Sequence, residues 1–145
     1  MELNIIDSLN TVGMIEKRQI ARFLHDHLDE YSDSMDNILK ALDYALQETS
    51  VDGGFLITAK EDEQLVGAVV YNRTGMEGYI PPNLLVYLAV HKDYRKRGIG
   101  SKLLQKSLEI AKGDIKVLVR KDSPASGLCE KFGFSIEHTE FRLKR

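Results

Sequence analysis

A run of seven uncharged residues near the middle of the chain constrains the fold most. It extends from Leu84 to Val90, and such a run is typical of a strand covered on both faces of a sheet. Apolar residues at helical spacing follow between about Gly98 and Lys112, and Gly113 stands where a helix C-terminus favours glycine. Ile115–Val119 predicts the next strand. The order strand, helix, strand indicates parallel strands joined by a right-handed crossover.

The N-terminal half predicts further elements of an α/β domain. A strand is expected at Leu3–Asp7, followed by a helix at about Thr11–Leu28 and a second helix that begins after the N-cap Ser34. Two apolar runs, 55–59 and 65–71, flank a polar turn and predict an antiparallel hairpin.

The C-terminal part predicts one more helix and the last strands. Ser123 and Pro124 suit the start of a short helix that runs to Gly133. The segment from Phe134 to Leu143 is expected to close the sheet with one or two strands. Ligands bind at the carboxyl ends of parallel strands, so a cleft is expected between the strand that ends at Val90 and the strand that starts at Ile115.

Composition and charge exclude several classes of protein. With 43% hydrophobic and 29% charged residues and three prolines, the chain is typical of a globular domain and not of a disordered or fibrous protein. The net charge of −2 gives no overall attraction to nucleic acid or to a membrane surface. The one cysteine, Cys129, excludes an intramolecular disulfide and suits a reducing compartment. Because neither a secretory signal nor a long apolar stretch is present, we expect a cytoplasmic protein.

The segment that follows the uncharged run carries the main functional signal. Gly98 and Gly100 precede the expected helix, so they let its free backbone N–H groups approach a ligand, and the helix dipole favours an anion there. Five cations lie within the same eleven residues: Lys92, Arg95, Lys96, Arg97 and Lys102. The pattern predicts a site for a diphosphate and a further phosphate; the alternative is a solvated loop with ordinary turn glycines. Leu103 in place of a glycine disfavours a dinucleotide fingerprint, and no P-loop pattern occurs.

The sequence Arg95-Lys96-Arg97-Gly98-Ile99-Gly100 matches the R/Q-x-x-G-x-G/A acetyl-CoA signature. Together with the order of elements, it resembles the GNAT superfamily of N-acetyltransferases over nearly the whole chain. The resemblance implies one N-acetyltransferase domain over residues 1–145, with acetyl-CoA as co-substrate. It also implies a GNAT-like α/β (α+β) fold, a mixed, mostly antiparallel sheet of six to seven strands flanked by about four helices.

The resemblance also implies which residues bind the cofactor. The backbone of Leu88, Ala89 and Val90 pairs with the pantetheine arm, and a bulge there separates this strand from the next. The pyrophosphate cradle consists of Arg95, Lys96, Arg97, Gly98, Ile99, Gly100 and Ser101. Arg97 and Lys102 are expected to reach the 3′-phosphate.

The catalytic acid is where the sequence departs from the family pattern. The family's N-x-x-A-x-x-L-Y aligns with residues 122–129, where Asp122 replaces the asparagine and Cys129 stands in place of the tyrosine acid. Cys129 is therefore the candidate proton donor to the departing thiolate; the alternative is a small buried apolar residue. Loss of the acid would cost only about 10²-fold, because a thiolate leaves readily. Tyr87 is a further candidate if its side chain points into the cleft; the alternative is an aromatic residue of the core. His91 is a candidate base; the alternative is a loop residue.

The acceptor region is expected between the first two helices. Residues 25–36 contain five acids, which either form an anionic rim that attracts a cationic amine or belong to a solvated connection that favours the following helix N-terminus. His25 and His27 are two residues apart and make a poor metal pair, so no metal is assigned. The expected acceptor is a small-molecule or peptide amine; we expect neither nucleic acid nor membrane as partner, and a homodimer is left open.

The predicted reaction is direct attack of a primary amine on acetyl-CoA in a ternary complex. Three alternatives stay open at this point. The chain could transfer a different acyl group or use a hydroxyl acceptor, or it could be a non-catalytic CoA-binding regulatory module. It could also bind nucleic acid through the cations between Lys92 and Lys102.

Overall fold

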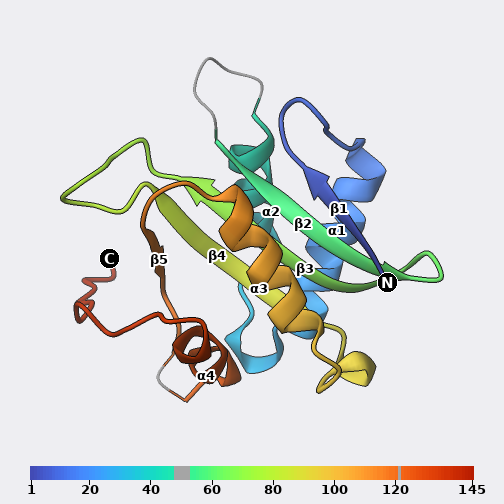
Figure 1. Cartoon of the computed structure of the whole chain (residues 1–145). Coiled ribbons are helices and arrows are strands. Elements are labelled where there is room, and N and C mark those ends of the chain that lie inside the picture. Colours follow the sequence, from blue (N-terminus) through green and yellow to red (C-terminus); the bar gives the residue numbers. More distant parts are fainter. Residues whose placement is uncertain (48–52, 121) are drawn as a thin grey trace.

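A mixed sheet forms the centre of the molecule (Figure 1). The computed structural model describes residues 1–47, 53–120 and 122–145. The strands of this sheet lie side by side in chain order: β1 (Glu2–Ile6), β2 (Gly54–Glu61), β3 (Gln64–Arg73), β4 (Asn83–Val90) and β5 (Ile115–Val117). The first three pairings are antiparallel and β4 pairs with β5 in parallel. This confirms the predicted mixed, mostly antiparallel sheet.

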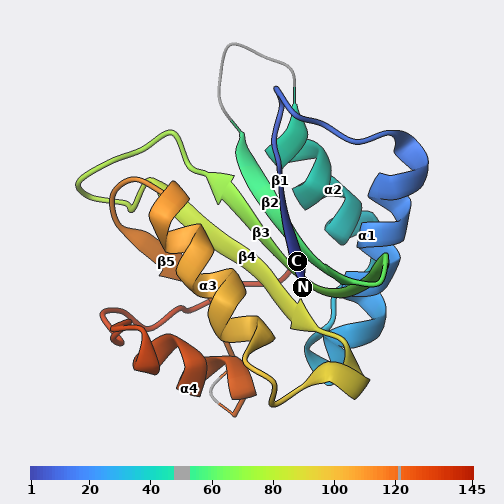
Figure 2. The same ribbon diagram turned by 45° about the vertical axis from the view of Figure 1, so that its right-hand side comes forward.

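Helices cover both faces of the sheet (Figure 2). Two of them, α1 (Met14–His27) and α2 (Met35–Leu46), pack on one face, and α3 (Ile99–Ile110) packs on the other. The short helix α4 (Pro124–Lys131) follows β5. Single 3₁₀ turns, η1 (Asp29–Tyr31) and η2 (Lys92–Tyr94), follow α1 and β4. None of the helices in the described ranges has the length and apolarity needed to cross a lipid bilayer.

Local sequence signals explain several element boundaries. The Asn37 N–H donates to Ser34 Oγ at 3.1 Å, so Ser34 caps α2 as predicted. Ser123 caps α4 in the same way through the N–H of Ala125, at 3.2 Å. The first helix begins only at Met14, three residues later than expected, after Gly13 as its N-cap.

The C-terminal strands are the part of the prediction that is wrong. Residues 134–145 form neither strand nor helix, so the described residues form a sheet of five strands and not of six to seven. Phe134 packs against the core, but three later apolar side chains are exposed: Ile136 by 87%, Phe141 by 94% and Leu143 by 78%. Alternating apolar residues favour a strand only when a partner strand is available. β5 offers a short edge, because it ends at Val117 and not at the predicted Val119.

A bulge in β4 positions the site. Val70 faces Tyr87 and Tyr71 faces Leu85, so Val86 is an extra residue in β4. The pairing of β4 with β5 ends at Leu85 opposite Val117, directly before that extra residue. The rest of β4, up to Val90, therefore has no strand on its β5 side within the described residues.

Candidate functional site

The exposed edge of β4 presents backbone groups that can bind a ligand. The His91 N–H donates to Val66 O at 2.8 Å, and the antiparallel pattern of alternating bonds then directs the N–H and C=O of Leu88 and Val90 away from β3. Ala89 lies between them and its backbone groups face β3. The edge expected to pair with a pantetheine arm is thus open at Leu88 and at the N–H of Val90, whereas Val90 O accepts a hydrogen bond from Arg95 Nε at 3.1 Å.

The N-terminus of α3 lies directly after this edge. Gly98 is its N-cap, with φ 82° and ψ 9°, a left-handed conformation that favours glycine. A glycine has no side chain for capping, and within the described residues no acceptor contacts the N–H groups of Gly98, Ile99, Gly100 and Ser101. Four free amides at the positive end of a helix dipole form a site for an anion such as phosphate.

Gly100 is not required by the packing of the protein. A Cβ atom at this position would lie 3.4 Å from Leu128 Cδ2 and 3.6 Å from Val90 Cγ2, which are ordinary van der Waals distances, and φ of Gly100 is not positive. These contacts place the end of β4, the start of α3 and α4 around one point. The missing side chain leaves the helix end accessible to a ligand.

The five predicted cations divide into two groups. Lys96, Arg97 and Lys102 form no ion pair within the part of the chain that the structure describes, and the Arg97 guanidinium carbon lies 4.9 Å from the centre of the Tyr94 ring. Lys92 and Arg95 instead contact the Asp29 carboxylate, at 3.9 Å and 2.7 Å. Only the first group is available to complement phosphate without breaking an ion pair.

Arg95 makes three hydrogen bonds to the protein. Its Nε donates to Val90 O at 3.1 Å, and its Nη2 donates to His27 O at 2.8 Å. Its Nη1 donates to Asp29 Oδ2 at 2.7 Å, and this bond is the main reason why the pKa of the Asp29 carboxyl lies below its usual range. The guanidinium therefore connects the end of β4 with the C-terminal end of α1.

Tyr87 and Asp33 form the second contact between β4 and the segment that joins α1 to α2. The Tyr87 hydroxyl donates to Asp33 Oδ2 at 2.9 Å, while the N–H of Ser34 and the amide of Asn37 both donate to Asp33 Oδ1 at 2.8 Å. Burial disfavours the charged carboxylate, but these hydrogen bonds outweigh it and lower the pKa of Asp33. Burial, then the hydrogen bond to Asp33, raises the pKa of Tyr87, so this phenol stays protonated.

Two of the five acids in residues 25–36 therefore contact β4 or the turn after it. The sequence pointed to this acidic segment but not to Asp29 and Asp33 individually. Their partners are 66 and 54 residues further along the chain, and no local pattern encodes such pairs.

Cys129 is buried in α4, with 5% of its surface exposed. Burial raises the pKa of its thiol, so the thiol is protonated near neutral pH and is not an activated nucleophile. The chain that precedes α4 also contacts the segment between α1 and α2, because the Tyr31 hydroxyl donates to Asp122 O at 3.3 Å.

His27 and His91 lie face to face, with ring centres 4.2 Å apart. The Lys92 N–H donates to His27 Nδ1 at 3.2 Å and the Asp93 N–H donates to His91 Nδ1 at 3.1 Å, so both Nδ1 atoms act as acceptors. Burial and then His91 lower the pKa of His27. In the described ranges no group of three or more His, Cys, Asp or Glu residues could hold a metal ion.

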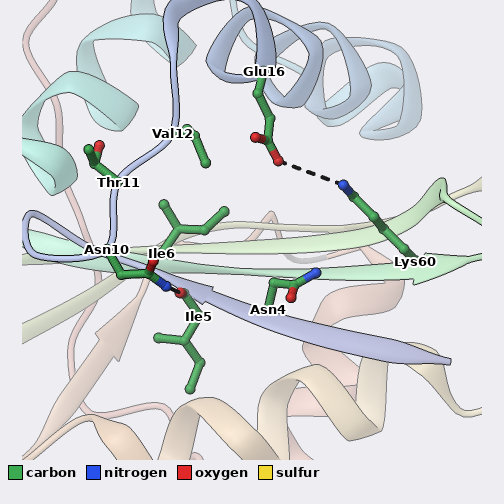
Figure 3. Close-up of a pocket in the computed structure, with 8 residues that line it drawn as sticks. All are labelled: Asn4, Ile5, Ile6, Asn10, Thr11, Val12, Glu16 and Lys60. Atoms are coloured by element: carbon green, nitrogen blue, oxygen red, sulfur yellow. Dashed lines mark hydrogen bonds and ion pairs between the residues drawn. The ribbon is translucent and has the colours of Figure 1, made fainter.

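A separate pocket lies beside β1 and the start of α1 (Figure 3). It has a volume of about 280 Å³, and Glu16 and Lys60 face each other across it at 3.6 Å. The pocket shares no lining residue with the β4 edge or the α3 turn.

In this structure a helix N-terminus with free amides lies beside the open end of a mixed sheet. Such an arrangement is typical of α/β proteins that bind phosphate-containing ligands at strand ends. Residues 52–136 match the family model described as an acetyltransferase (GNAT) domain. The chain belongs to the GNAT acetyltransferase family. None of the curated proteins matches it.

Solved structures share this fold over the whole chain. A possible acetyltransferase from Clostridium difficile 630 is 18% identical, with a TM-score of 0.69, 100% of this chain and 99% of that chain being covered. The aminoglycoside N-acetyltransferase AAC(6′)-Iy in complex with CoA is 15% identical, with a TM-score of 0.67 and coverage of 99% and 95%. A ribosomal-protein-alanine N-acetyltransferase from Brucella melitensis biovar Abortus 2308 is also 15% identical, with a TM-score of 0.66 and coverage of 99% and 98%. At these identities the likeness shows the fold alone.

Proposed function

We propose that the chain is a single-domain, acetyl-CoA-dependent N-acetyltransferase. It moves an acetyl group to a primary amine of a small molecule or peptide, by direct attack in a ternary complex. The observation that carries this proposal is the continuity of two open backbone surfaces, the edge of β4 at Leu88–Val90 and the free amides of Gly98–Ser101. The family match and the CoA complex of a neighbour with the same fold support it.

The donor set fits a nucleotide-derived thioester. The amides at Gly98, Ile99, Gly100 and Ser101 would hold the diphosphate, while Lys96, Arg97 and Lys102 add charge around it. The backbone of Leu88 and the N–H of Val90 would pair with the pantetheine arm, so the thioester would lie near the bulge at Val86. Acetyl-CoA would supply the activated acetyl carbon, and the chain would orient it toward the acceptor side.

The chain offers one candidate proton donor to the sulfur. Cys129 holds its proton near neutral pH because burial raises its pKa, and we propose that it protonates the departing thiolate. Tyr87 also keeps its proton, but its hydroxyl already donates a hydrogen bond to Asp33. A residue that only packs in the core would be buried in the same way as Cys129. Replacement by alanine therefore separates the two roles.

The acceptor approaches from the segment between α1 and α2. Asp29 and Asp33 belong to this segment; Arg95 and Lys92 contact Asp29, and the Tyr87 hydroxyl donates to Asp33, so Asp33 would contribute most of the negative charge that attracts a cationic acceptor. Two neighbours with this fold are named as an aminoglycoside N-acetyltransferase and a ribosomal-protein-alanine N-acetyltransferase, so the panel of acceptors includes aminoglycosides and peptides with a free N-terminus. We place the reaction in the cytoplasm, with neither nucleic acid nor membrane as partner.

One observation favours a second candidate function, a non-catalytic CoA-binding module. The position of the family's tyrosine acid holds a buried thiol, Cys129. Such a module would bind CoA without releasing thiol in the presence of any amine.

Two measurements on the whole chain test the proposal. Acetyl-CoA is expected to raise the melting temperature, and thiol release is expected to accelerate with at least one amine from a panel of polyamines, aminoglycosides, amino acids and peptides. Binding without accelerated release would favour the non-catalytic module. A panel of acyl-CoAs identifies the acyl donor. If the chain binds an oligonucleotide and CoA does not displace it, that result would contradict the proposed site.

A further inference from the structure

Arg95, the first arginine of the R-x-x-G-x-G pattern, is expected in the phosphate cradle. Its side chain instead forms hydrogen bonds with Val90, Asp29 and His27. We propose that Arg95 is a positioning residue: its guanidinium fastens the segment His27–Tyr31, on the acceptor side, to the end of β4, and it does not bind the phosphates of CoA. This inference rests on the proposed function, because it names the role of a residue next to the proposed cofactor site. It concerns the contact between that site and the acceptor side.

The geometry of the guanidinium supports this role. Nε, Nη1 and Nη2 each donate to a different protein oxygen, on Val90, Asp29 and His27, at 2.7–3.1 Å. Arginine recognises a phosphate through two parallel N–H groups from two nitrogens. Three of the five N–H groups of Arg95 are bonded to the protein, and the Asp29 carboxylate balances its charge. A phosphate would therefore have to compete with Asp29 for this guanidinium.

The segment that Arg95 fastens needs an external anchor. Asp29 has a positive φ of 55°, a left-handed conformation that is unfavourable for a residue with a side chain. Arg95 binds its carboxylate, and Lys92 lies 3.9 Å from the same group. These contacts offset the backbone cost and keep η1 in place.

The fastened segment reaches across the open part of the sheet. At one end, Arg95 ties His27 and Asp29 to Val90, the last residue of β4. At the other end, the Tyr31 hydroxyl contacts Asp122 O, just before α4. The segment therefore contacts both β4 and the chain after β5, beyond the point where the pairing of these two strands ends at Leu85 and Val117. Its position decides how an acceptor amine can approach the thioester.

Three variants test the inference: Arg95→Gln, Asp29→Asn and the double variant. Hydrogen exchange measured by mass spectrometry reports on residues 27–34, and calorimetry reports the CoA dissociation constant. A positioning role predicts faster exchange over residues 27–34 in both single variants, with no further increase in the double variant. It also predicts CoA affinities that stay within about threefold of each other in Arg95→Gln and Asp29→Asn.

A direct phosphate contact predicts the opposite pattern. Arg95→Gln would then weaken CoA binding at least tenfold, whereas Asp29→Asn would leave it unchanged or tighten it because the guanidinium is released. That result, or unchanged exchange over residues 27–34 in both variants, would overturn the inference. Failure of the wild-type chain to bind CoA would refute the proposed function instead, and the exchange data would still test the contact.

The chain offers a matched control pair. Arg142 and Glu140 form an exposed ion pair at 2.7 Å in the C-terminal segment, outside the proposed site. Arg142→Gln and Glu140→Gln are expected to change neither the exchange over residues 27–34 nor the CoA affinity. If Arg95→Gln does not fold, Asp29→Asn still tests the positioning role, because unchanged exchange over residues 27–34 in this variant would overturn it.

Discussion

The Tyr87 hydroxyl donates a 2.9 Å hydrogen bond to the carboxylate of Asp33, and this bond joins the bulged strand β4 to the segment before α2. Because the bulge at Val86 turns both Val86 and Tyr87 toward the α1 and α2 side, the phenol reaches an acid that is 54 residues away in the sequence. The contact holds the segment before α2, on the proposed acceptor side, next to β4, the strand that would bind the cofactor.

Tyr87→Phe removes this bond and leaves Asp33 with one donor fewer. Hydrogen bonds to charged groups contribute about 1.5–3 kcal/mol, so we expect the free energy of unfolding to fall by about 1–2 kcal/mol at neutral pH, since the pair is only partly buried. Urea denaturation measures this change. Tyr79→Phe is the control, because Tyr79 is 82% exposed and its replacement should leave stability unchanged. Equal stability of Tyr87→Phe and wild type would show that the bond contributes nothing.

Gly100→Asp tests the cofactor turn with a charge at the anion site. A Cβ atom at this position meets protein atoms only at 3.4 Å or more, and an acid in the first turn of a helix is favoured by the helix dipole, so the fold should be kept. The carboxylate would compete with the diphosphate for the free amides, and we expect the CoA dissociation constant to rise at least tenfold by calorimetry. Gly100→Ala is the control, because the methyl group fits and the signature accepts alanine here, so its CoA affinity should stay within about threefold of wild type. Unchanged CoA affinity in Gly100→Asp would refute this role for the turn.

The pKa of His27 predicts how stability depends on pH. Burial, then His91, lowers this pKa below 6.5, with Lys92 and Arg95 adding to the effect and Asp26 opposing it. The unfolded chain therefore binds a proton at a higher pH than the folded chain. Stability from this group is fully present above pH 6.5 and is lost as the pH falls below it.

Thermal unfolding between pH 5 and 8 measures this effect. His27→Gln is expected to flatten the slope below pH 6.5, because it removes the group that gains a proton on unfolding. His138→Gln is the control, since His138 lies in the exposed C-terminal segment. An equal slope in His27→Gln and wild type would contradict the prediction.

Cys129→Ala separates the two roles of the thiol. As a proton donor, Cys129 should contribute about 10²-fold to turnover, whereas CoA affinity should change little. Thiol release from acetyl-CoA, with the best acceptor from the panel, measures turnover, and calorimetry measures affinity. Turnover within threefold of wild type would assign Cys129 to packing alone.

The sequence predicted the parts of the fold that local signals specify. The serine caps of α2 and α4, the hairpin β2–β3 and the parallel β4–β5 pair all follow from residues close in sequence, and the structure contains each of them. The family match bears out the resemblance that rested on the turn at Arg95–Gly100 and on the order of elements.

The remaining features depend on contacts across the fold. The alternation after Phe134 favours strands, but the short β5 provides no partner for them. The hydrogen bonds of Arg95 depend on Asp29, which another element positions. Neither result could be read from local spacing, because each depends on where distant segments meet.

A crystal structure of the chain with CoA is the most direct test of the proposed cofactor site. We expect the diphosphate within hydrogen-bond distance of the N–H groups of Gly98–Ser101, and the pantetheine arm along β4 at Leu88 and Val90. A diphosphate bound elsewhere on the molecule, or no bound CoA at saturating concentration, would contradict it.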